Sequence, residues 1–331
     1  MTLLPNKNQN GIALIMTLFG LALVVLITAG IMKKQSTMVL RTQAYLEKQQ
    51  QQEIALAAEI LAKRMLEKDH EKDTKDGARI DALTEAWLGQ SVSLPVENTN
   101  MSVSLQINDL SGRLNLNDLV TPSGTIDSFT QQRFTNLFSS LGIENLHIET
   151  LVDWIDSNKE ETRPYGAEDG AYLISQPPYR SANQPFSSVT ELRLMEGATE
   201  EEVQALMPYV TALPIKGNGL NINSAPVTVI MSLHPRINRK EAQTADNRRK
   251  EKPFSKITEF LALPAFAGIA IPSERLHVSS HFFEAIIQVA RNDGGVIRMI
   301  TRLYRDDQGK VFVIDRSLGR NVKINKPSAI L

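Results

Sequence analysis

A short acidic segment near the middle of the chain carries five side chains with hard oxygen donors: Asp153, Asp156, Asn158, Glu168 and Asp169. A loop that contains a proline and a glycine separates the first three from the last two, and it could fold all of them around one centre. Calcium prefers six to eight such oxygens and tolerates irregular geometry. The spacing does not match an EF-hand loop. The residues alone therefore leave two interpretations open: a calcium site, or a solvated acidic loop in which Asp153 or Asp156 caps a helix.

The rest of the sequence offers little that could catalyse a reaction. There are no cysteines, which excludes disulfides, thiol catalysis and thiolate metal sites. The sequence has no P-loop, glycine-rich dinucleotide turn, nucleophile elbow or His-Glu-x-x-His helix. Glu168 and Asp169 are adjacent, so both cannot face one substrate without special backbone geometry. His277 and His281 are interpreted as a surface pair. We therefore predict no enzymatic activity.

The composition is that of a folded protein. Its 331 residues are enough for one large domain or two modest ones. Hydrophobic residues make up 42% of the chain and charged residues 22%, which allows a buried core. The formal net charge of −1 disfavours nucleic acid as a partner, because phosphate binding needs clustered Lys and Arg.

The amino-terminal segment is apolar enough to cross a membrane. Residues 11–32 contain no charged side chain, and an apolar helix of ~20 residues spans a hydrocarbon core about 30 Å thick. A cleaved secretory peptide should end its apolar core after roughly 7–15 residues, whereas this run continues to Met32. We therefore predict that the helix is retained. Lys33 and Lys34 follow it, and the charge rule alone would keep their side cytoplasmic.

Residues 35–68 continue as an amphipathic helix. Apolar side chains recur there at spacings of four, three and four, which places them on one stripe: Ile54, Ala58, Leu61 and Met65. An isolated rod would expose this stripe, so we predict that it packs against other subunits. At 1.5 Å per residue, residues 12–68 would form a rod of roughly 85 Å. The charged residues 68–78, with Gly77 near their end, predict the helix exit and a loop.

Alternating apolar and polar residues predict strands on both sides of a helical middle. Residues 103–107 alternate, a turn follows, and residues 114–117 begin a second extended piece, which predicts a hairpin. The pattern returns at residues 281–289, 296–304 and 311–314, which are separated by turns rich in Asp and Gly. Residues 125–275 are mostly helical in character. We predict an α+β fold, with a long amino-terminal helix and an antiparallel sheet interrupted by a large, mostly helical insertion.

The helical middle contains an internal repeat. Residues 186–192 (FSSVTEL) match residues 254–260 (FSKITEF), and in both a Ser precedes a Glu as in a capping box. Residues 114–117 (LNLN) recur as residues 220–223 (LNIN). Such units suggest helix-hairpin-helix motifs, which bind DNA in other proteins, so a membrane-tethered nucleic-acid-binding protein is the alternative hypothesis. The basic run of residues 236–252 fits this alternative hypothesis. A charge run is usually a solvated helix face, however, and no paired aromatic residues lie beside this one.

The junction between Gly11 and Ile12 lies between a short basic leader and the apolar run. It resembles the prepilin peptidase site of type IV pilins and type II secretion pseudopilins. The resemblance implies cleavage between these two residues, methylation of Ile12, and a head outside the cytoplasm, which outweighs the lysine pair. These families usually carry Glu at the fifth mature position, where this chain has Met16. The missing Glu and the large globular part resemble the K-type minor pseudopilins (GspK family), which cap the pseudopilus tip.

The resemblance covers nearly the whole chain and implies its organisation. It assigns residues 1–11 to the leader, 12–32 to the transmembrane helix, 33–68 to the periplasmic half of that helix, 69–124 and 276–331 to a pilin-like head, and 125–275 to an insertion with duplicated helix-hairpin-helix-like units. It implies a single-pass protein of the inner membrane with a periplasmic head. The implied partners are the I- and J-type minor pseudopilins, the prepilin peptidase and the inner-membrane secretion platform. Contacts with siblings are expected through Met16 and the stripe.

The resemblance also implies a ligand for the acidic segment. The stretches Asp-Trp-Ile-Asp and Gly-Ala-Glu-Asp look like the segment of K-type pseudopilins that carries bound calcium. A structural Ca²⁺ held by Asp156, Asn158, Glu168 and Asp169 is therefore expected, with Asp153 as a further candidate ligand.

Overall fold

The computed structural model describes residues 9–85, 87–89, 91–214, 217 and 219–319. It divides into two compact units, Met1–Leu56 and Ala57–Leu331. One helix, α1 (Gln9–Asp76), makes up the described part of the first unit and ends in the second. It ends later than the predicted position 68, and Gly77 follows with φ of 74°, a left-handed conformation that favours glycine after a helix. Leader residues 1–8 lie outside the described residues.

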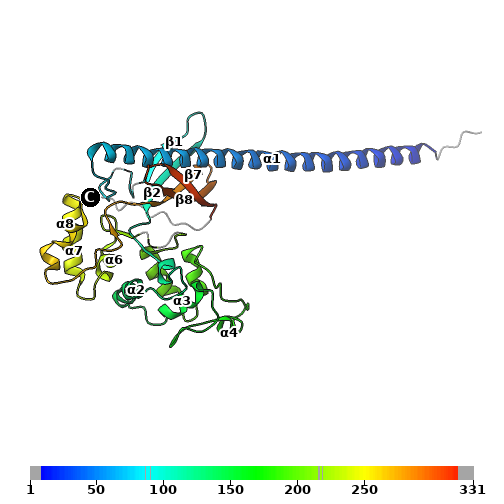
Figure 1. Ribbon diagram of the computed structural model, residues 1–331. Helices are drawn as coiled ribbons and strands as arrows, with labels where there is room; N and C mark the ends of the chain where they lie inside the picture. Colours follow the sequence, from blue (N-terminus) through cyan, green and yellow to red (C-terminus); the bar gives the residue numbers. More distant parts are fainter. Residues whose placement is uncertain (1–8, 86, 90, 215–216, 218, 320–331) are drawn as a thin grey trace, which may run out of the picture. The chain divides into compact units, whose positions relative to one another are not determined.

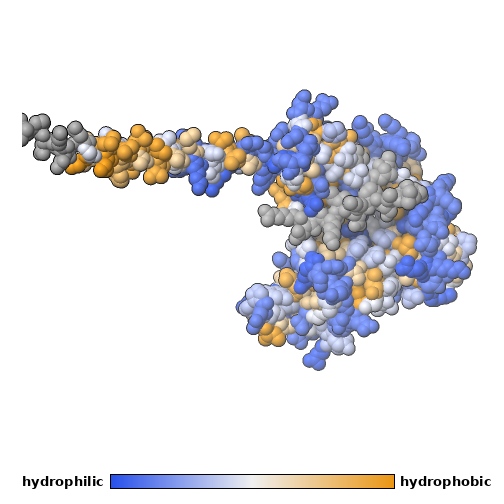
Figure 2. All heavy atoms as spheres, turned by 180° about the vertical axis from the view of Figure 1, so that it is seen from behind, coloured by the Kyte–Doolittle hydropathy of each residue, from blue (hydrophilic) through white to orange (hydrophobic). Residues whose placement is uncertain are grey.

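The first unit is an apolar helix over residues 11–32. By length and composition, α1 contains one segment that could cross a membrane, and none of that segment is buried within the protein. Figure 2 shows apolar residues covering this part of the helix, whereas hydrophilic residues cover much of the visible face of the second unit. This helix therefore fits a single membrane span.

The second unit contains a five-stranded antiparallel sheet of order β1-β2-β7-β8-β9. Its strands are β1 (Ser91–Pro95), β2 (Met101–Asp109), β7 (Phe282–Arg291), β8 (Val296–Arg305) and β9 (Val311–Ser317). β7 occupies the centre, and most of its side chains are buried. The last turns of α1 lie along the sheet (Figure 1). The four strands predicted from alternation at residues 103–107, 281–289, 296–304 and 311–314 are confirmed.

The predicted hairpin between residues 103–107 and 114–117 is wrong. β2 pairs with β1 and β7, whereas β3 (Leu114–Asn115) pairs in parallel with β4 (Val210–Thr211). The insertion therefore occupies residues 110–281, between β2 and β7, rather than 125–275. A strand of two residues has too few alternating positions to reveal its partner in the sequence.

Two repeats make up the insertion. The first contains, in chain order, β3, η1 (Leu116–Leu119), α2 (Ser128–Leu141), α3 (Ile148–Ile155), α4 (Asp169–Tyr172), η2 (Val189–Leu194), α5 (Glu200–Leu206), η3 (Met207–Tyr209) and β4. The second contains β5 (Leu220–Asn221), α6 (Val227–Ser232), α7 (Arg239–Glu251), α8 (Ile257–Leu261), η4 (Pro264–Phe266) and β6 (Leu276–His277), and β5 pairs in parallel with β6. One hydrophobic core joins them.

The duplicated sequence segments occupy equivalent places in the two repeats. Asn117 contacts the backbone of Phe186 in the first repeat, and Asn223 contacts the backbone of Phe254 in the second. These pairs are 69 and 31 positions apart. The first repeat is longer because α2 is longer than α6 and because the acidic loop follows α3.

The predicted capping box is present in one copy of the duplicated segment. In the first copy, Ser188 and Glu191 make both of its hydrogen bonds at the start of η2. In the second copy the helix begins after Lys256 without a side-chain cap, and the Ser255 hydroxyl bonds to Glu259 at 2.5 Å instead.

Candidate functional site

The residues predicted to contact other subunits do not all share one exposed face. Met16 is exposed in the first unit, and Leu61 is 47% exposed. Ile54 and Met65 are half-buried. Ala58 is only 6% exposed, so it is not available to another subunit, and its assignment to an exposed stripe is corrected here.

The face of α1 that carries Ala58 belongs to the head. Ala62 and Leu66 follow it at spacings of four, so the three side chains lie one above another on the helix. Both are fully buried. Glu59 also belongs to this region, where it accepts hydrogen bonds from Thr301 at 2.9 Å and from Arg316 at 2.6 and 2.8 Å. The spacing pattern detected an apolar stripe, but it could not distinguish burial in the head from burial against a sibling.

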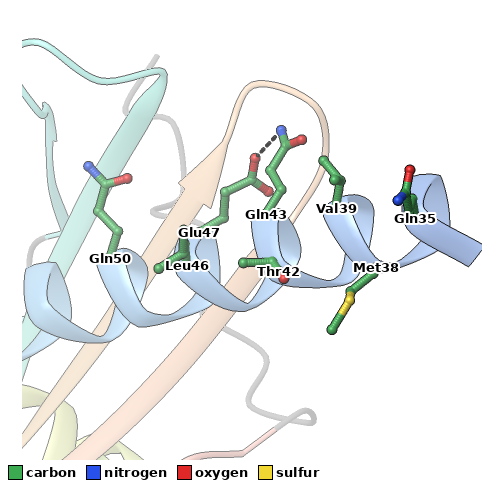
Figure 3. Close-up of a pocket in the computed structure, with 8 residues that line it drawn as sticks. All are labelled: Gln35, Met38, Val39, Thr42, Gln43, Leu46, Glu47 and Gln50. Carbon is green, nitrogen blue, oxygen red and sulfur yellow. Dashed lines mark hydrogen bonds between the residues drawn. The ribbon is translucent and has the colours of Figure 1, made fainter.

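The segment of α1 beyond the membrane span keeps exposed apolar side chains. Met38, Val39 and Leu46 are exposed in the first unit. Figure 3 shows them among polar residues, with the Gln43 amide donating to Glu47 at 2.9 Å. A helix that exposes apolar groups beside polar ones fits lateral packing against another helix.

The acidic segment forms a loop that closes over the end of α3. Asp153 is fully buried, and its two carboxylate oxygens accept from the Thr162 N–H at 3.0 and 3.1 Å. Gly166 lies so close to Asp153 that a Cβ at position 166 would be 2.2 Å from the Asp153 carboxylate. Asp156, at the end of α3, accepts from the Asn158 N–H at 3.2 Å and from its amide at 2.8 Å.

Glu168 is the residue of this loop with the most unusual surroundings. It is 5% exposed, and within the described part of the chain both of its carboxylate oxygens are buried without a hydrogen-bond partner. Burial, and then the nearby Asp153 and Asp156 carboxylates, raise the pKa of Glu168 to about 6. Buried carboxylates are costly unless paired or bound to a metal. An oxygen-binding cation would satisfy this site.

The oxygens of the other two predicted ligands accept hydrogen bonds from other groups. Asp169 accepts from the Arg180 guanidinium at 3.0 Å and from the Ser181 N–H at 3.2 Å. Asn158 is exposed, and its amide oxygen accepts from the Glu160 N–H at 2.7 Å. The loop thus brings together Asp153, Asp156 and Glu168. Asn158 bonds to Asp156, whereas Asp169 contacts Arg180 and Ser181.

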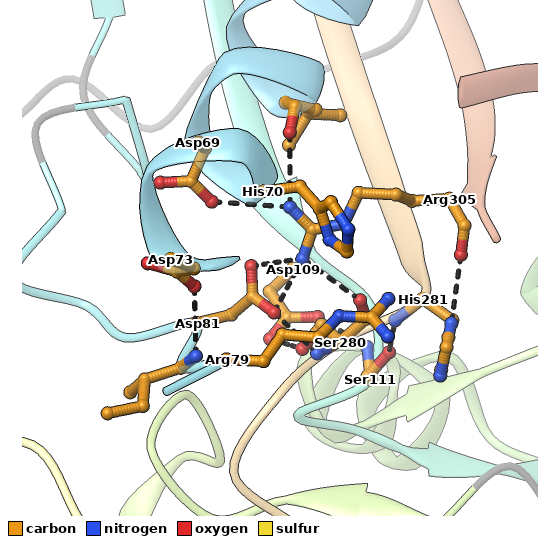
Figure 4. A network of polar contacts seen from close by, with 12 residues as sticks. Asp69, His70, Asp73, Arg79, Asp81, Asp109, Ser111, Ser280, His281 and Arg305 are labelled. Carbon is orange, nitrogen blue, oxygen red and sulfur yellow. Dashed lines mark hydrogen bonds and ion pairs between the residues drawn. The ribbon is translucent and has the colours of Figure 1, made fainter. Parts of the chain in front are cut away.

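A buried polar network that the sequence did not reveal lies where the insertion joins the sheet (Figure 4). Arg305, at the end of β8, is fully buried and donates to Asp81 at 2.5 and 2.6 Å and to Asp69 at 3.2 Å. Asp109, at the end of β2, accepts from Ser280 at 2.6 Å and also from Ser224. The network therefore ties the end of α1, the sheet and the second repeat together. Its partners are too distant in sequence for a spacing pattern to find them.

The basic run in the second repeat is partly buried in the fold. Arg249 is 3% exposed and donates to Asp246 and to the Ile222 carbonyl, both at 2.6 Å. Lys250 also pairs with Asp246 at 2.6 Å. Arg249 therefore belongs to the packing of α7, whereas Arg239, Lys240 and Lys252 are exposed, as on a solvated helix face.

Comparisons with known proteins match this arrangement over nearly its whole length. Two family models described as type II secretion system (T2SS), protein K, match residues 112–215 and 220–279, which are the two repeats. The chain is 29% identical over 319 residues to type II secretion system protein K of Pseudomonas aeruginosa, covering 95% of this chain and 94% of that protein. It is 30% identical over 329 residues to the protein K of Klebsiella pneumoniae, covering 95% and 98%. A chain in the crystal structure of the GspK-GspI-GspJ complex from enterotoxigenic Escherichia coli matches with a TM-score of 0.72 and 25% identity, covering 85% of this chain and all of that one.

A single apolar amino-terminal helix followed by an antiparallel-sheet head defines a pilin-like subunit, and the length and composition of the helix fit single-pass anchoring. The two repeats inserted between β2 and β7 are the feature that the family models recognise. The chain belongs to the type II secretion system protein K family.

Proposed function

We propose that this chain is the minor pseudopilin that caps the tip of the periplasmic pseudopilus and helps to initiate its assembly. The observation that carries the proposal is Met16, an apolar side chain where related pilins are expected to carry a carboxylate that meets the amino group of a neighbouring subunit. A buried carboxylate is costly unless paired. A subunit that lacks it has no such bond to offer on one side, as suits a terminal position.

The rest of the proposal concerns processing, partners and location. The prepilin peptidase cleaves between Gly11 and Ile12, Ile12 is methylated, and the retained helix stays in the inner membrane with the head in the periplasm. The solved relative comes from a complex with GspI and GspJ, which supports I- and J-type subunits as lateral partners. The inner-membrane platform receives the assembly. The chain itself performs no catalysis in this scheme.

We also propose that the acidic loop holds a structural Ca²⁺. Asp153, Asp156 and Glu168 are the side chains that fit it best, because the burial of two unpartnered Glu168 oxygens calls for a cation. Calcium accepts several carboxylates in an irregular geometry. Once bound, it would neutralise these carboxylates and fix the loop to the end of α3.

Co-purification of the membrane-extracted chain with its I- and J-type partners tests the assembly role. Leu46→Asp and Leu61→Asp each place a charge on an exposed apolar position of α1, and each should lower the recovery of both partners several-fold. Gln49→Asp, at an exposed polar position of the same helix, is the matched control and should leave recovery unchanged. Full recovery with both Leu variants would contradict the proposal, provided that the heads melt at the wild-type temperature.

A further inference from the structure

Three carboxylates from two segments meet beside the last turns of α1. Asp69 comes from the helix, whereas Asp81 and Glu85 come from the connection between α1 and β1. Oxygens of all three lie within 4.8 Å of one another. Like charges this close and this buried cannot all be ionised, so at least one carboxylate of such a group keeps its proton well above the usual pH.

The nearest cation, Arg305, forms hydrogen bonds with only two of these three carboxylates within the described residues. Arg305 donates to Asp81 and Asp69 and makes no hydrogen bond to Glu85 within the described residues. One oxygen of Glu85 is buried and has no partner in the described part of the chain. Burial, and then Asp69, Asp81 and Asp73, raise the pKa of Glu85 to about 9. Glu85 is therefore the member that holds a proton at neutral pH.

The charged surroundings come from every element packed around the cluster. Arg79 is turned towards the β8–β9 turn, where it donates to Asp307 at 3.2 Å and to the Asp306 carbonyl at 3.1 Å. Among the described residues, the other titratable and charged groups here are Asp73 and His70 on α1, Asp109 at the end of β2, His281 before β7, and Arg305 on β8. Acidic groups outnumber the cations, which favours an added positive charge.

Trp87 packs beside the Asp69 carboxylate of this cluster. Its ring packs edge-to-face on Phe283 with centroids 5.6 Å apart, and the side chain is 8% exposed. Burial raises the pKa of Asp69, and the indole N–H of Trp87, which faces this carboxylate, opposes the rise. An N–H donor and a guanidinium already point at these oxygens, which leaves poor coordination for a metal ion but suits a proton.

We propose that Asp69, Asp81 and Glu85 share a bound proton that fastens the connection between α1 and β1 to the last turns of α1, so that the packing of this connection depends on pH. Other hydrogen bonds also hold this connection, among them one from the Asn221 amide to the Asp81 carbonyl at 2.9 Å. Asp73 accepts from the Ile80 N–H at 2.9 Å, Asp81 donates through its N–H to the Val278 carbonyl at 3.0 Å, and Gly89 bonds to the Ile107 carbonyl at 2.7 Å.

The direction of the pH effect follows from the raised pKa. In the unfolded chain Glu85 loses its proton near 4.5, the ordinary pKa of a glutamate side chain, whereas the folded chain keeps the proton up to about 9. The folded state therefore binds the extra proton, and its stability falls as the pH rises through this window. Above pH ~9 the ionised Glu85 repels Asp69 and Asp81, and the connection loosens.

Fluorine NMR of the full chain, labelled with 5-fluorotryptophan in detergent micelles, reads this site directly. The chain has two tryptophans, Trp87 beside the cluster and Trp154 in the insertion core. The Trp87 signal should shift with pH with a midpoint near 9, and the Trp154 signal should stay constant over this range. Trp87→Phe assigns the two signals.

Three variants test whether protonation of Glu85 causes the pH-dependent shift of the Trp87 signal. Glu85→Gln should hold the Trp87 signal at its low-pH position throughout, Asp69→Asn should move the midpoint to lower pH, and the exposed control Glu97→Gln should titrate like the wild type. A Trp87 signal that does not titrate in the wild type, or still titrates in Glu85→Gln, overturns the proposal. So does a shift on adding Ca²⁺, Mg²⁺ or Zn²⁺ at neutral pH that Glu85→Gln abolishes, because the cluster would then bind a metal.

Discussion

Asn117 and Phe186 exchange two hydrogen bonds although they are 69 positions apart: the Asn117 amide donates to the Phe186 carbonyl at 3.0 Å, and the Phe186 N–H donates back at 2.7 Å. The second repeat contains the same exchange between Asn223 and Phe254, at 2.9 Å in both directions. In each repeat, a buried Asn side chain thus makes the pair of hydrogen bonds that the backbone of a neighbouring strand would make. These bonds join two distant segments of the repeat.

Asn117→Ala should lower the free energy of unfolding of the head by about 2–4 kcal/mol, because it leaves buried backbone groups without partners. The Asn117 amide also donates to the Leu213 carbonyl at 3.0 Å. Urea unfolding of a soluble fragment lacking residues 1–34 measures the change. Asn223→Ala should have a similar effect, and the exposed control Asn100→Ala should change stability by less than about 0.5 kcal/mol. A difference of less than about 1 kcal/mol between Asn117→Ala and this control would mean that the exchange does not hold the repeat together.

Arg305→Met should lower the free energy of unfolding by about 3–5 kcal/mol, because it leaves the buried Asp81 carboxylate without its cation. The double variant Arg305→Met/Asp81→Leu removes both charges and should recover most of that loss. Arg64→Met is the matched control, since the Arg64 side chain is 73% exposed and pairs only with Glu67 within the described residues. If the double variant proved as unstable as the single one, the loss would come from packing and not from the unpaired charge.

Four of the five strands of the sheet could be predicted from apolar patterns, of which those of β2 and β8 are long. The short edge strand β1 was not predicted. The partner of residues 114–115 could not be predicted, because a strand of two residues lacks a pattern and its partner lies at residues 210–211. The sequence pattern predicts an end of α1 at residue 68, which is too early, because residues 68–76 are mostly charged. In the structure they remain helical, and one face turns inwards, where His70 is 9% exposed and Asp69 pairs with Arg305.

The candidate sites show the same limit. The acidic loop could be predicted because its carboxylates are close in sequence. Which of them come together depends on how Gly166 and Thr162 fold over Asp153. The buried polar network could not be predicted because Arg305 and Asp81 are 224 positions apart in the sequence. The stripe through Ala58 was detected correctly as apolar, yet the period of a helix does not tell which neighbour covers it.

The head should lose stability as the pH rises from about 4 to about 6, through Asp73. Burial raises the pKa of Asp73 from 3.8 to about 6. The folded state therefore holds a proton in this window that the unfolded chain has released, and stability falls with rising pH. Melting temperatures of wild type and Asp73→Asn, compared across this window, isolate this contribution, since the variant cannot titrate. Asp76→Asn, at an exposed position of the same turn, should follow the wild type. Parallel curves for wild type and Asp73→Asn would exclude the effect.

Calcium should raise the melting temperature of the soluble fragment, because a ligand that binds only the folded state stabilises it. Glu168→Gln removes one charge at the centre of the loop and should abolish most of this rise. Glu160→Gln, at an exposed position of the same loop, should keep it. Isothermal calorimetry checks the same point. The absence of both heat and a thermal shift at millimolar Ca²⁺ would contradict the proposed calcium site.

The mature amino terminus tests the central claim most directly, because a pilin-like subunit must keep its apolar helix after processing. Mass spectrometry of the chain purified from membranes that contain the prepilin peptidase should find a polypeptide that begins at Ile12 and carries one methyl group on its amino nitrogen. A mature chain that begins beyond Lys34 would have lost the helix and would contradict assembly by lateral helix packing.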